Sequence, residues 1–242
     1  MKRFTPLKLS VAISFFAALA FVALAKEADP VTHDFLAPNA VDYQAVLTPP
    51  PAEDSIPAQG EHELAVELDA HRTPEQAAFA KSYEKLDVFK LLAPVLGDWC
   101  TAENLPRTAA LFRQARAESR PVVEAAKAGW NRSRPYNFNP ALTPAVEKPH
   151  NTSYPSGHGY DSALYAVLLT AALPDHAADW QKQAALVRWS RLVGGAHYPS
   201  DVVAGKILGE AVGREMLKSP KLQQALDEVR TELAARLHRK AA

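Results

Sequence analysis

A histidine and an aspartate four residues apart, His197 and Asp201, are the pair in this sequence best suited to covalent catalysis. His197 follows 194–196 (Gly-Gly-Ala), where a helix can end, and Asp201 would lie in the first turn of the next helix, capped by Ser200. An aspartate there can accept from one ring nitrogen and fix the tautomer, which leaves the other nitrogen as a nucleophile. A structural His–Asp pair is the alternative, but it does not explain the nearby Arg191.

A second group of residues, Tyr154-Pro155-Ser156-Gly157-His158, comes directly before an apolar stretch. Ser156 is a plausible N-cap, and the amides at a helix N-terminus can receive an anion. Gly157 would let an oxyanion approach the backbone, because it has no side chain in the way. His158 would then be placed to deliver a proton. The alternative is an ordinary capped turn that carries a surface histidine.

The third group contains Lys127 and Arg134, followed by Pro135. Alone, two cations are more often part of a solvated surface. Phosphoryl transfer, however, needs cations around three oxygens, an in-line nucleophile and an acid at the leaving oxygen. Lys127, Arg134 and Arg191 would supply the charges, and Ser156 with the Gly157 and His158 amides would add donors. The residues therefore predict a phosphate site that requires no metal and no cofactor.

Helix signals cover most of the chain beyond residue 60, and no alternating apolar–polar run is long enough to predict a sheet. Thr73-Pro74-Glu75 is typical of a helix start. The stretch 131–154, with four prolines, predicts a long loop. The chain is thus expected to be an all-α, single-domain bundle. The predicted helices are 73 to about 92, one or two within 105–128 interrupted near Arg120-Pro121, 157–172, 176 to about 193, 200–217 and 222–237.

Three glycines four residues apart, Gly205, Gly209 and Gly213, fall on one face of a predicted helix. Each costs about 1 kcal/mol of helix propensity relative to alanine. We therefore expect this face to let a neighbouring helix approach closely.

The first 25 residues have the pattern of a secretory signal peptide. Lys2, Arg3 and Lys8 precede the apolar run 10–24, and Ala23-Leu24-Ala25 fits a signal peptidase site. A membrane anchor is the alternative, but the run is shorter than the roughly 20 residues that span a bilayer. Cleavage near Ala25 would place the protein in the periplasm or outside the cell, with no stable membrane anchor.

The remaining chain divides into a proline-rich, extended arm at 26–60 and a helical domain at 61–242. The arm is equally compatible with an unordered leader, a surface strap or a dimer contact, so a homo-oligomer stays possible. The formal net charge of zero gives no indication of a nucleic-acid partner. The single cysteine, Cys100, cannot form an internal disulfide and is expected to be buried as a small apolar side chain.

The three groups, in this order, resemble the signature of the type 2 phosphatidic acid phosphatase superfamily. Its pattern reads K-x6-R-P, then P-S-G-H, then S-R-x5-H-x3-D, and every fixed position is matched. Within the superfamily, 42–217 is most similar to the soluble bacterial class A nonspecific acid phosphatases. Two positions depart from their G-S-Y-P-S-G-H-T: Thr152 replaces the first glycine and Gly159 the final threonine.

The resemblance implies a helical bundle of the acid phosphatase and vanadium haloperoxidase type, and metal-independent hydrolysis of small phosphomonoesters. It also implies roles: His197 as the nucleophile that forms a phosphohistidine, Asp201 as its orienting partner and His158 as the general acid. The implied phosphate ligands are Lys127, Arg134, Ser156, Gly157 and Arg191.

Three other functions remain open at this stage. A vanadate-dependent haloperoxidase would share the anion pocket, although such chains tend to be much longer. A soluble lipid-phosphate phosphatase would share the chemistry. An exported phosphoester-binding protein would need neither nucleophile nor acid.

Two histidines with opposite requirements predict a pH optimum. The general acid must be protonated and the nucleophile neutral, and an unperturbed histidine has a pKa of about 6.5. Asp201 is expected to raise the pKa of His197. A bell-shaped profile centred below neutrality follows.

Overall fold

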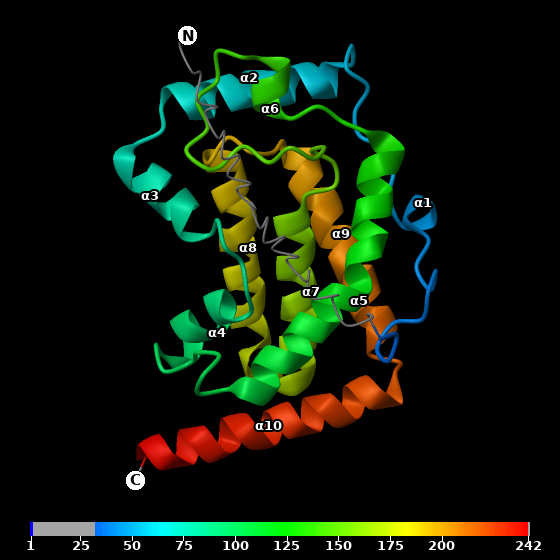
Figure 1. The fold of residues 1–242 in the computed structure, drawn as a ribbon, viewed down its shortest axis with the longest axis vertical. Helices are drawn as coiled ribbons and strands as arrows, with labels where there is room; N and C mark the ends of the chain where they lie inside the picture. The colour runs from blue at the N-terminus through cyan, green and yellow to red at the C-terminus, as the bar shows by residue number, and fades with distance from the viewer. Residues whose placement is uncertain (2–31, 242) are drawn as a thin grey trace. The chain divides into compact units, whose positions relative to one another are not determined.

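Three helices run alongside one another in the middle of the molecule: α7 (Gly157–Ala172), α8 (Ala177–Val193) and α9 (Pro199–Met216) (Figure 1). The structure is a computed structural model that describes Met1 and residues 32–241, and those from 32 onward belong to one compact unit. A 3₁₀ turn (Pro174–His176) links α7 to α8, and a glycine turn links α8 to α9. Because both connections are short, the start of α7, the end of α8 and the start of α9 lie at the same end of this layer.

Two long helices cross the ends of the central layer (Figure 1). α2 (Ile56–Ala70) lies across the end where α9 begins, and α10 (Pro220–Ala241) lies across the other. α5 (Pro106–Trp130) packs against α7, α9 and α10. The other helices are α1 (Tyr43–Val46), α3 (Pro74–Ser82), α4 (Phe89–Leu96) and α6 (Pro135–Phe138). The part of the chain that the structure describes contains no strand, and the predicted all-α class is confirmed.

Two predicted helix boundaries are wrong. The helix that begins at Thr73, with the expected capping box to Gln76, ends at Ser82 instead of continuing to about residue 92. A new helix starts at Phe89 because the Asp87 carboxylate accepts from the Phe89 amide at 2.9 Å. Conversely, α5 is one helix that continues through Pro121, although a proline removes one backbone hydrogen bond from a helix interior.

The predicted signal peptide and the first residues of the arm lie outside the described residues. The rest of the arm is shorter than predicted, because α2 begins at Ile56, where the Ser55 hydroxyl accepts from the Ala58 amide. The short helix α1 also lies within it. In the described residues, no helix combines the length and the apolar character that a membrane crossing needs.

The glycine face of α9 packs on α7, as predicted. A Cβ atom at Gly205 would lie 2.4 Å from the Ser156 carbonyl oxygen, and one at Gly209 would lie 2.3 Å from the Tyr160 carbonyl oxygen. Any side chain at these positions would therefore push the two backbones apart. The two glycines therefore let the start of α9 lie against the start of α7. The predicted catalytic residues are at these two helix starts.

The apolar core fills the space between α4, α5, α7, α8, α9 and α10. Tyr160 and Trp180 are among its largest fully buried side chains. Cys100 belongs to this core, as its predicted burial requires.

Candidate active site

His197 lies in the turn between α8 and α9. Gly195, with φ of +73°, is in the left-handed region that favours glycine, and it lets the chain turn after α8 ends. The N-cap of α9 is Tyr198, not Ser200 as predicted, because Pro199 takes the first helical position. Asp201 does lie in the first turn, and its Oδ2 accepts from the Tyr198 amide at 2.8 Å.

His197 and Asp201 form a buried pair. Nδ1 of His197 lies 3.3 Å from Oδ2 of Asp201. The hydroxyl of Ser153 donates to the same carboxylate oxygen at 2.5 Å and lies 3.3 Å from Nδ1. Nε2, the other ring nitrogen, faces a cation, with Nη1 of Arg134 at 3.2 Å. The geometry therefore keeps Nδ1 on the Asp201 side and directs Nε2 towards the positive charge.

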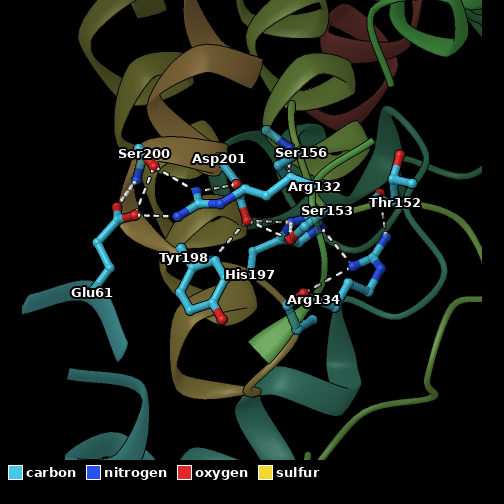
Figure 2. A network of polar contacts seen from close by, with 12 residues as sticks. Glu61, Arg132, Arg134, Thr152, Ser153, Ser156, His197, Tyr198, Ser200 and Asp201 are labelled. Atoms are coloured by element: carbon cyan, nitrogen blue, oxygen red, sulfur yellow. Dashed lines mark hydrogen bonds and ion pairs between the residues drawn. The ribbon is translucent and has the colours of Figure 1, made fainter. Parts of the chain in front are cut away.

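Arg132 and Glu61 hold Asp201 from the opposite side, as Figure 2 shows. Arg132 is buried, and its Nη1 donates to Asp201 Oδ1 at 2.7 Å and to the Ser200 hydroxyl at 2.8 Å. Its Nη2 donates to Glu61 of α2 at 2.6 Å. Glu61 also accepts from the Ser200 amide at 2.6 Å. The network joins the start of α9 to α2. It also keeps Oδ1 of Asp201 paired with the positive charge of Arg132.

His197 lines a pocket of about 190 Å³. Six of the eight predicted site residues line it. Ser156 does not: its hydroxyl is buried and accepts from the Gly159 amide as the N-cap of α7. Asp201 does not line the pocket either, because it lies behind His197, as expected for the partner of the nucleophile. The six lining residues are Lys127, Arg134, Gly157, His158, Arg191 and His197.

Two of the three predicted cations are held by backbone carbonyls. Nζ of Lys127 donates to the carbonyl oxygens of Thr152 at 2.7 Å and of Ser153 at 3.3 Å. Arg134 donates from Nε to the Asn151 carbonyl at 2.7 Å and from Nη1 to the Ala196 carbonyl at 2.8 Å. The loop at 131–156 thus fixes both cations at the pocket.

Arg191, the third cation, is less completely satisfied. Its Nη1 lies 3.2 Å from Nε2 of His158, and its buried Nε has no hydrogen-bond partner among the described residues. Burial lowers its pKa to about 10, so it stays charged at any acidic or neutral pH. A donor without a partner beside the pocket is suited to an anion that enters it.

Lys127 changes charge close to neutrality. Burial, and next the charge of Arg134, lower its pKa to about 7. An anion in the pocket would favour the charged form of this lysine.

Both histidines have a lowered pKa, and for His197 this corrects the expectation from the sequence. Burial, and then the charge of Arg134, lower the pKa of His197 well below its usual range, although Asp201 acts in the opposite direction. His197 is therefore neutral, as a nucleophile must be. Burial and Arg191 lower the pKa of His158 to about 3, and its Nε2 lies 3.0 Å from the Tyr83 carbonyl oxygen.

Asp201 remains ionised next to the neutral histidine. Burial acts against its charge, but hydrogen bonds from His197 and Ser153 and the charge of Arg132 lower its pKa to about 2.

Several polar residues of this site were not predicted from the sequence. Arg132 lies within the K-x6-R-P motif at a position that the motif leaves open, and Ser153 lies just before P-S-G-H. Two further arginines of α5, Arg116 and Arg120, line the pocket. Their spacing of one helical turn is the only sequence signal that they share a face.

Among the described residues, no three His, Cys, Asp or Glu side chains gather as metal ligands would.

Comparison with known proteins places this site in a family. The PAP2 superfamily model matches residues 116–224, which contain all three motifs. The chain is 28% identical over 203 residues to a non-specific acid phosphatase of Salmonella typhimurium, covering 81% of each chain. It is 32% identical over 173 residues to an acid phosphatase of Zymomonas mobilis, covering 67% of this chain and 64% of that one.

The fold is also found among solved structures. A bacterial vanadium-dependent iodoperoxidase superposes with a TM-score of 0.55 at 18% identity. The match covers 71% of this chain and 52% of that one, so this chain spans about half the length of the iodoperoxidase. The helical arrangement is the same type.

Proposed function

Since the chain is a phosphatase of the PAP2 superfamily, we propose that it hydrolyses small phosphomonoesters at acidic pH through a phosphohistidine on His197. The observation that carries this proposal is the buried His197–Asp201 pair, whose histidine lines a pocket together with Lys127, Arg134 and Arg191. Such a pair supplies a nucleophile, and the cations supply the charge that a phosphoryl group needs. Export to the periplasm, with the leader removed near Ala25, stays a prediction of the sequence.

In the first step, Nε2 of His197 attacks the phosphorus atom in line with the leaving oxygen. A P–N bond forms, the P–O bond to the leaving group breaks, and its electron pair goes to the leaving oxygen. His158, in its protonated form, gives this oxygen a proton. Asp201 stabilises the positive imidazole that results, because it is ionised and faces Nδ1.

In the second step, water attacks the phosphorus atom from the same side that the leaving group left. The now neutral His158 accepts a proton from the water, the P–N bond breaks, and its electrons return to Nε2. Inorganic phosphate leaves. The Lys127, Arg134 and Arg191 side chains and the amides of Gly157 and His158 stabilise the equatorial oxygens in both steps. Ser156 contributes by capping the helix that presents these amides.

A panel of phosphomonoesters, assayed at acidic pH with EDTA present, tests the proposal. The wild type is expected to release phosphate from several of them. His197→Ala should lower kcat by at least about a thousandfold, because the loss of a nucleophile removes the covalent path. His71→Ala, at an exposed position on the C-cap of α2, is the matched control and should keep wild-type rates.

Two results would contradict the proposal. One is that EDTA abolishes hydrolysis of every ester. The other is that His197→Ala retains phosphate affinity while the wild type releases no phosphate, as a binding protein would.

A further inference from the structure

Arg132 is a buried cation that does not line the pocket. Its side chain is 6% exposed, and its guanidinium lies over the ring of Tyr198, with Cζ 4.3 Å from the ring centre. Nη1 donates to Asp201 and Nη2 to Glu61, so both terminal nitrogens already have partners within the protein (Figure 2). The mechanism proposed above gives this cation no role, because it is not among the residues that would contact the reacting phosphate.

Two carboxylates from distant segments fix the orientation of this guanidinium. Oδ1 of Asp201 accepts from Nη1 at 2.7 Å, and Oε2 of Glu61 accepts from Nη2 at 2.6 Å. The Glu61 carboxylate also accepts from the amide and the hydroxyl of Ser200, at 2.6 and 2.9 Å, in the first turn of α9. Glu61 on α2 therefore holds both Arg132 and the helix start that carries Asp201.

The two oxygens of Asp201 consequently have different partners. Oδ1 faces Arg132. Oδ2 accepts from the Ser153 hydroxyl and the Tyr198 amide, and it lies 3.3 Å from Nδ1 of His197. Because a guanidinium binds a carboxylate along fixed directions, the contact at Oδ1 keeps the carboxylate oriented with Oδ2 towards the histidine.

An ion pair that only joins α2 to the rest of the fold is the simpler explanation, and α2 has such a pair at its other end. Nη2 of Arg72 lies 2.8 Å from Oδ1 of Asp69, and these side chains are 8% and 15% exposed. Nε and Nη1 of Arg72 donate to the carbonyl oxygens of Val193 and Thr143 at 2.5 and 2.9 Å. This pair does not contact Asp201, whereas the Glu61–Arg132 pair lies directly against it.

The charge of Asp201 needs support because the residue is fully buried. Among the described residues, Arg132 is the only lysine or arginine that forms an ion pair with it. Glu61 is the charged group that α2 contributes, and it reaches Asp201 only through Arg132. The other titratable groups that face the carboxylate, from the turn, α5, the loop at 131–156 and the start of α9, are His197, Lys127, Arg134, Tyr154 and Tyr198.

We propose that Arg132, held by Glu61, is a positioning residue of the reaction, which keeps the Asp201 carboxylate ionised and directed at Nδ1 of His197 so that the enzyme works in acid. This rests on the function proposed above, since Arg132 acts through the same nucleophile. When Nε2 bonds to phosphorus, the imidazole becomes positively charged and its Nδ1 proton stays on the ring, hydrogen-bonded to Asp201. A protonated Asp201 would leave that charge without a partner.

Removal of the charge at Arg132 tests this role through the acid limb of the pH profile, where kcat/KM falls as the pH is lowered. Arg132→Gln/Glu61→Gln removes one charge of each sign and leaves no buried charge at position 61. Without the cation the pKa of Asp201 rises, so its carboxylate is protonated at a higher pH. The acid limb should therefore move upward by about one to three pH units, the effect of one nearby opposite charge on an aspartate.

The same variant should separate kcat from KM. We expect kcat at the optimum to fall by about tenfold, because the nucleophile loses an aligned partner. KM should change by less than about threefold, since neither Arg132 nor Glu61 lines the pocket. Glu61→Gln alone keeps the charge of Arg132 on Asp201, so its acid limb should not move upward.

Asp69→Asn/Arg72→Gln is the matched control, because it removes an ion pair of similar burial from the same helix. It should lower the melting temperature, as the test variant should, and it should leave the acid limb in its wild-type position. Melting temperatures measured at the assay pH show which variants are folded.

The outcomes separate this proposal from the one that it rests on. An unmoved acid limb in a folded Arg132→Gln/Glu61→Gln variant, or an equal shift in Glu61→Gln or in the control, would overturn the role of Arg132. A wild type that loses activity with the ordinary aspartate pKa of about 3.9 would overturn it as well, and that measurement needs no variant to fold. A wild type that releases no phosphate from any monoester would contradict the proposed function itself.

Discussion

At the scale of single residues, burial decides the protonation state of the catalytic pair. His197 is neutral because the pocket wall removes it from water and Arg134 lies close to Nε2. Asp201 is ionised because Arg132, Ser153 and His197 contact it. A neutral imidazole beside a carboxylate, both away from solvent, keeps its nucleophilic nitrogen available at acidic pH.

The charge of Lys127 adds to the expected loss of activity as the pH rises through neutrality. With a pKa of about 7, this lysine carries its positive charge below neutrality and loses it as the pH rises. His158, with a pKa of about 3, is likewise protonated to a greater extent at lower pH. Both effects have the same sign, so kcat/KM should be highest in acid, should decline as His158 loses its proton, and should fall more steeply as the pH passes about 7.

Lys127→Arg tests this assignment, because arginine stays charged throughout this range. In a pH–rate profile, the steeper fall of kcat/KM near pH 7 should be absent in the variant. A wild-type maximum in alkaline buffer, or the same steeper fall near pH 7 in both proteins, would contradict this role of Lys127.

At the scale of helices, the catalytic residues are placed by the close contact between α7 and α9. Ser156 caps α7 and Asp201 lies in the first turn of α9. The Ser156 amide donates to the Asp201 carbonyl at 2.9 Å, which joins the two helix starts directly. The glycines of α9 make this approach possible, since a Cβ would meet the backbone of α7.

Gly209→Ala should therefore destabilise the protein, by about 1–3 kcal/mol, because the new Cβ would lie 2.3 Å from the Tyr160 carbonyl oxygen. The matched control is Gly60→Ala in α2, where a Cβ would have no neighbour within 4 Å. That variant should be stabilised by up to about 1 kcal/mol through helix propensity. Chemical denaturation measures both. If Gly209→Ala unfolds at the same denaturant concentration as the wild type, the glycine face of α9 is not closely packed against α7.

At the scale of the whole molecule, local signals predicted the elements better than their connections. Thr73 and Ser156 start helices as expected, because a cap depends on residues within one turn. The helix start at Phe89 was not predicted, although the hydrogen bond from the Phe89 amide to the Asp87 carboxylate is equally local. Pro121 stays inside α5, where tertiary packing overrides the propensity of one residue.

The candidate site was predictable where its motifs are continuous and not where it relies on distant segments. The pocket brings together six residues chosen from the sequence. Glu61 was missed because it reaches Arg132 and Ser200 from α2, a contact between segments far apart in the chain. The pKa of His197 was expected to shift upward because of Asp201, and the sequence contained no measure of the burial that lowers it.

The central claim is that His197 carries the phosphoryl group, and rapid-quench trapping tests it most directly. Wild-type protein mixed with a ³²P-labelled monoester and quenched in alkali should contain a label that is stable in base and lost in acid. Mass spectrometry of the digested protein should place that label on His197, and His197→Ala should carry none. Label on another residue, or no label from a protein that turns over at its full rate, would contradict the account.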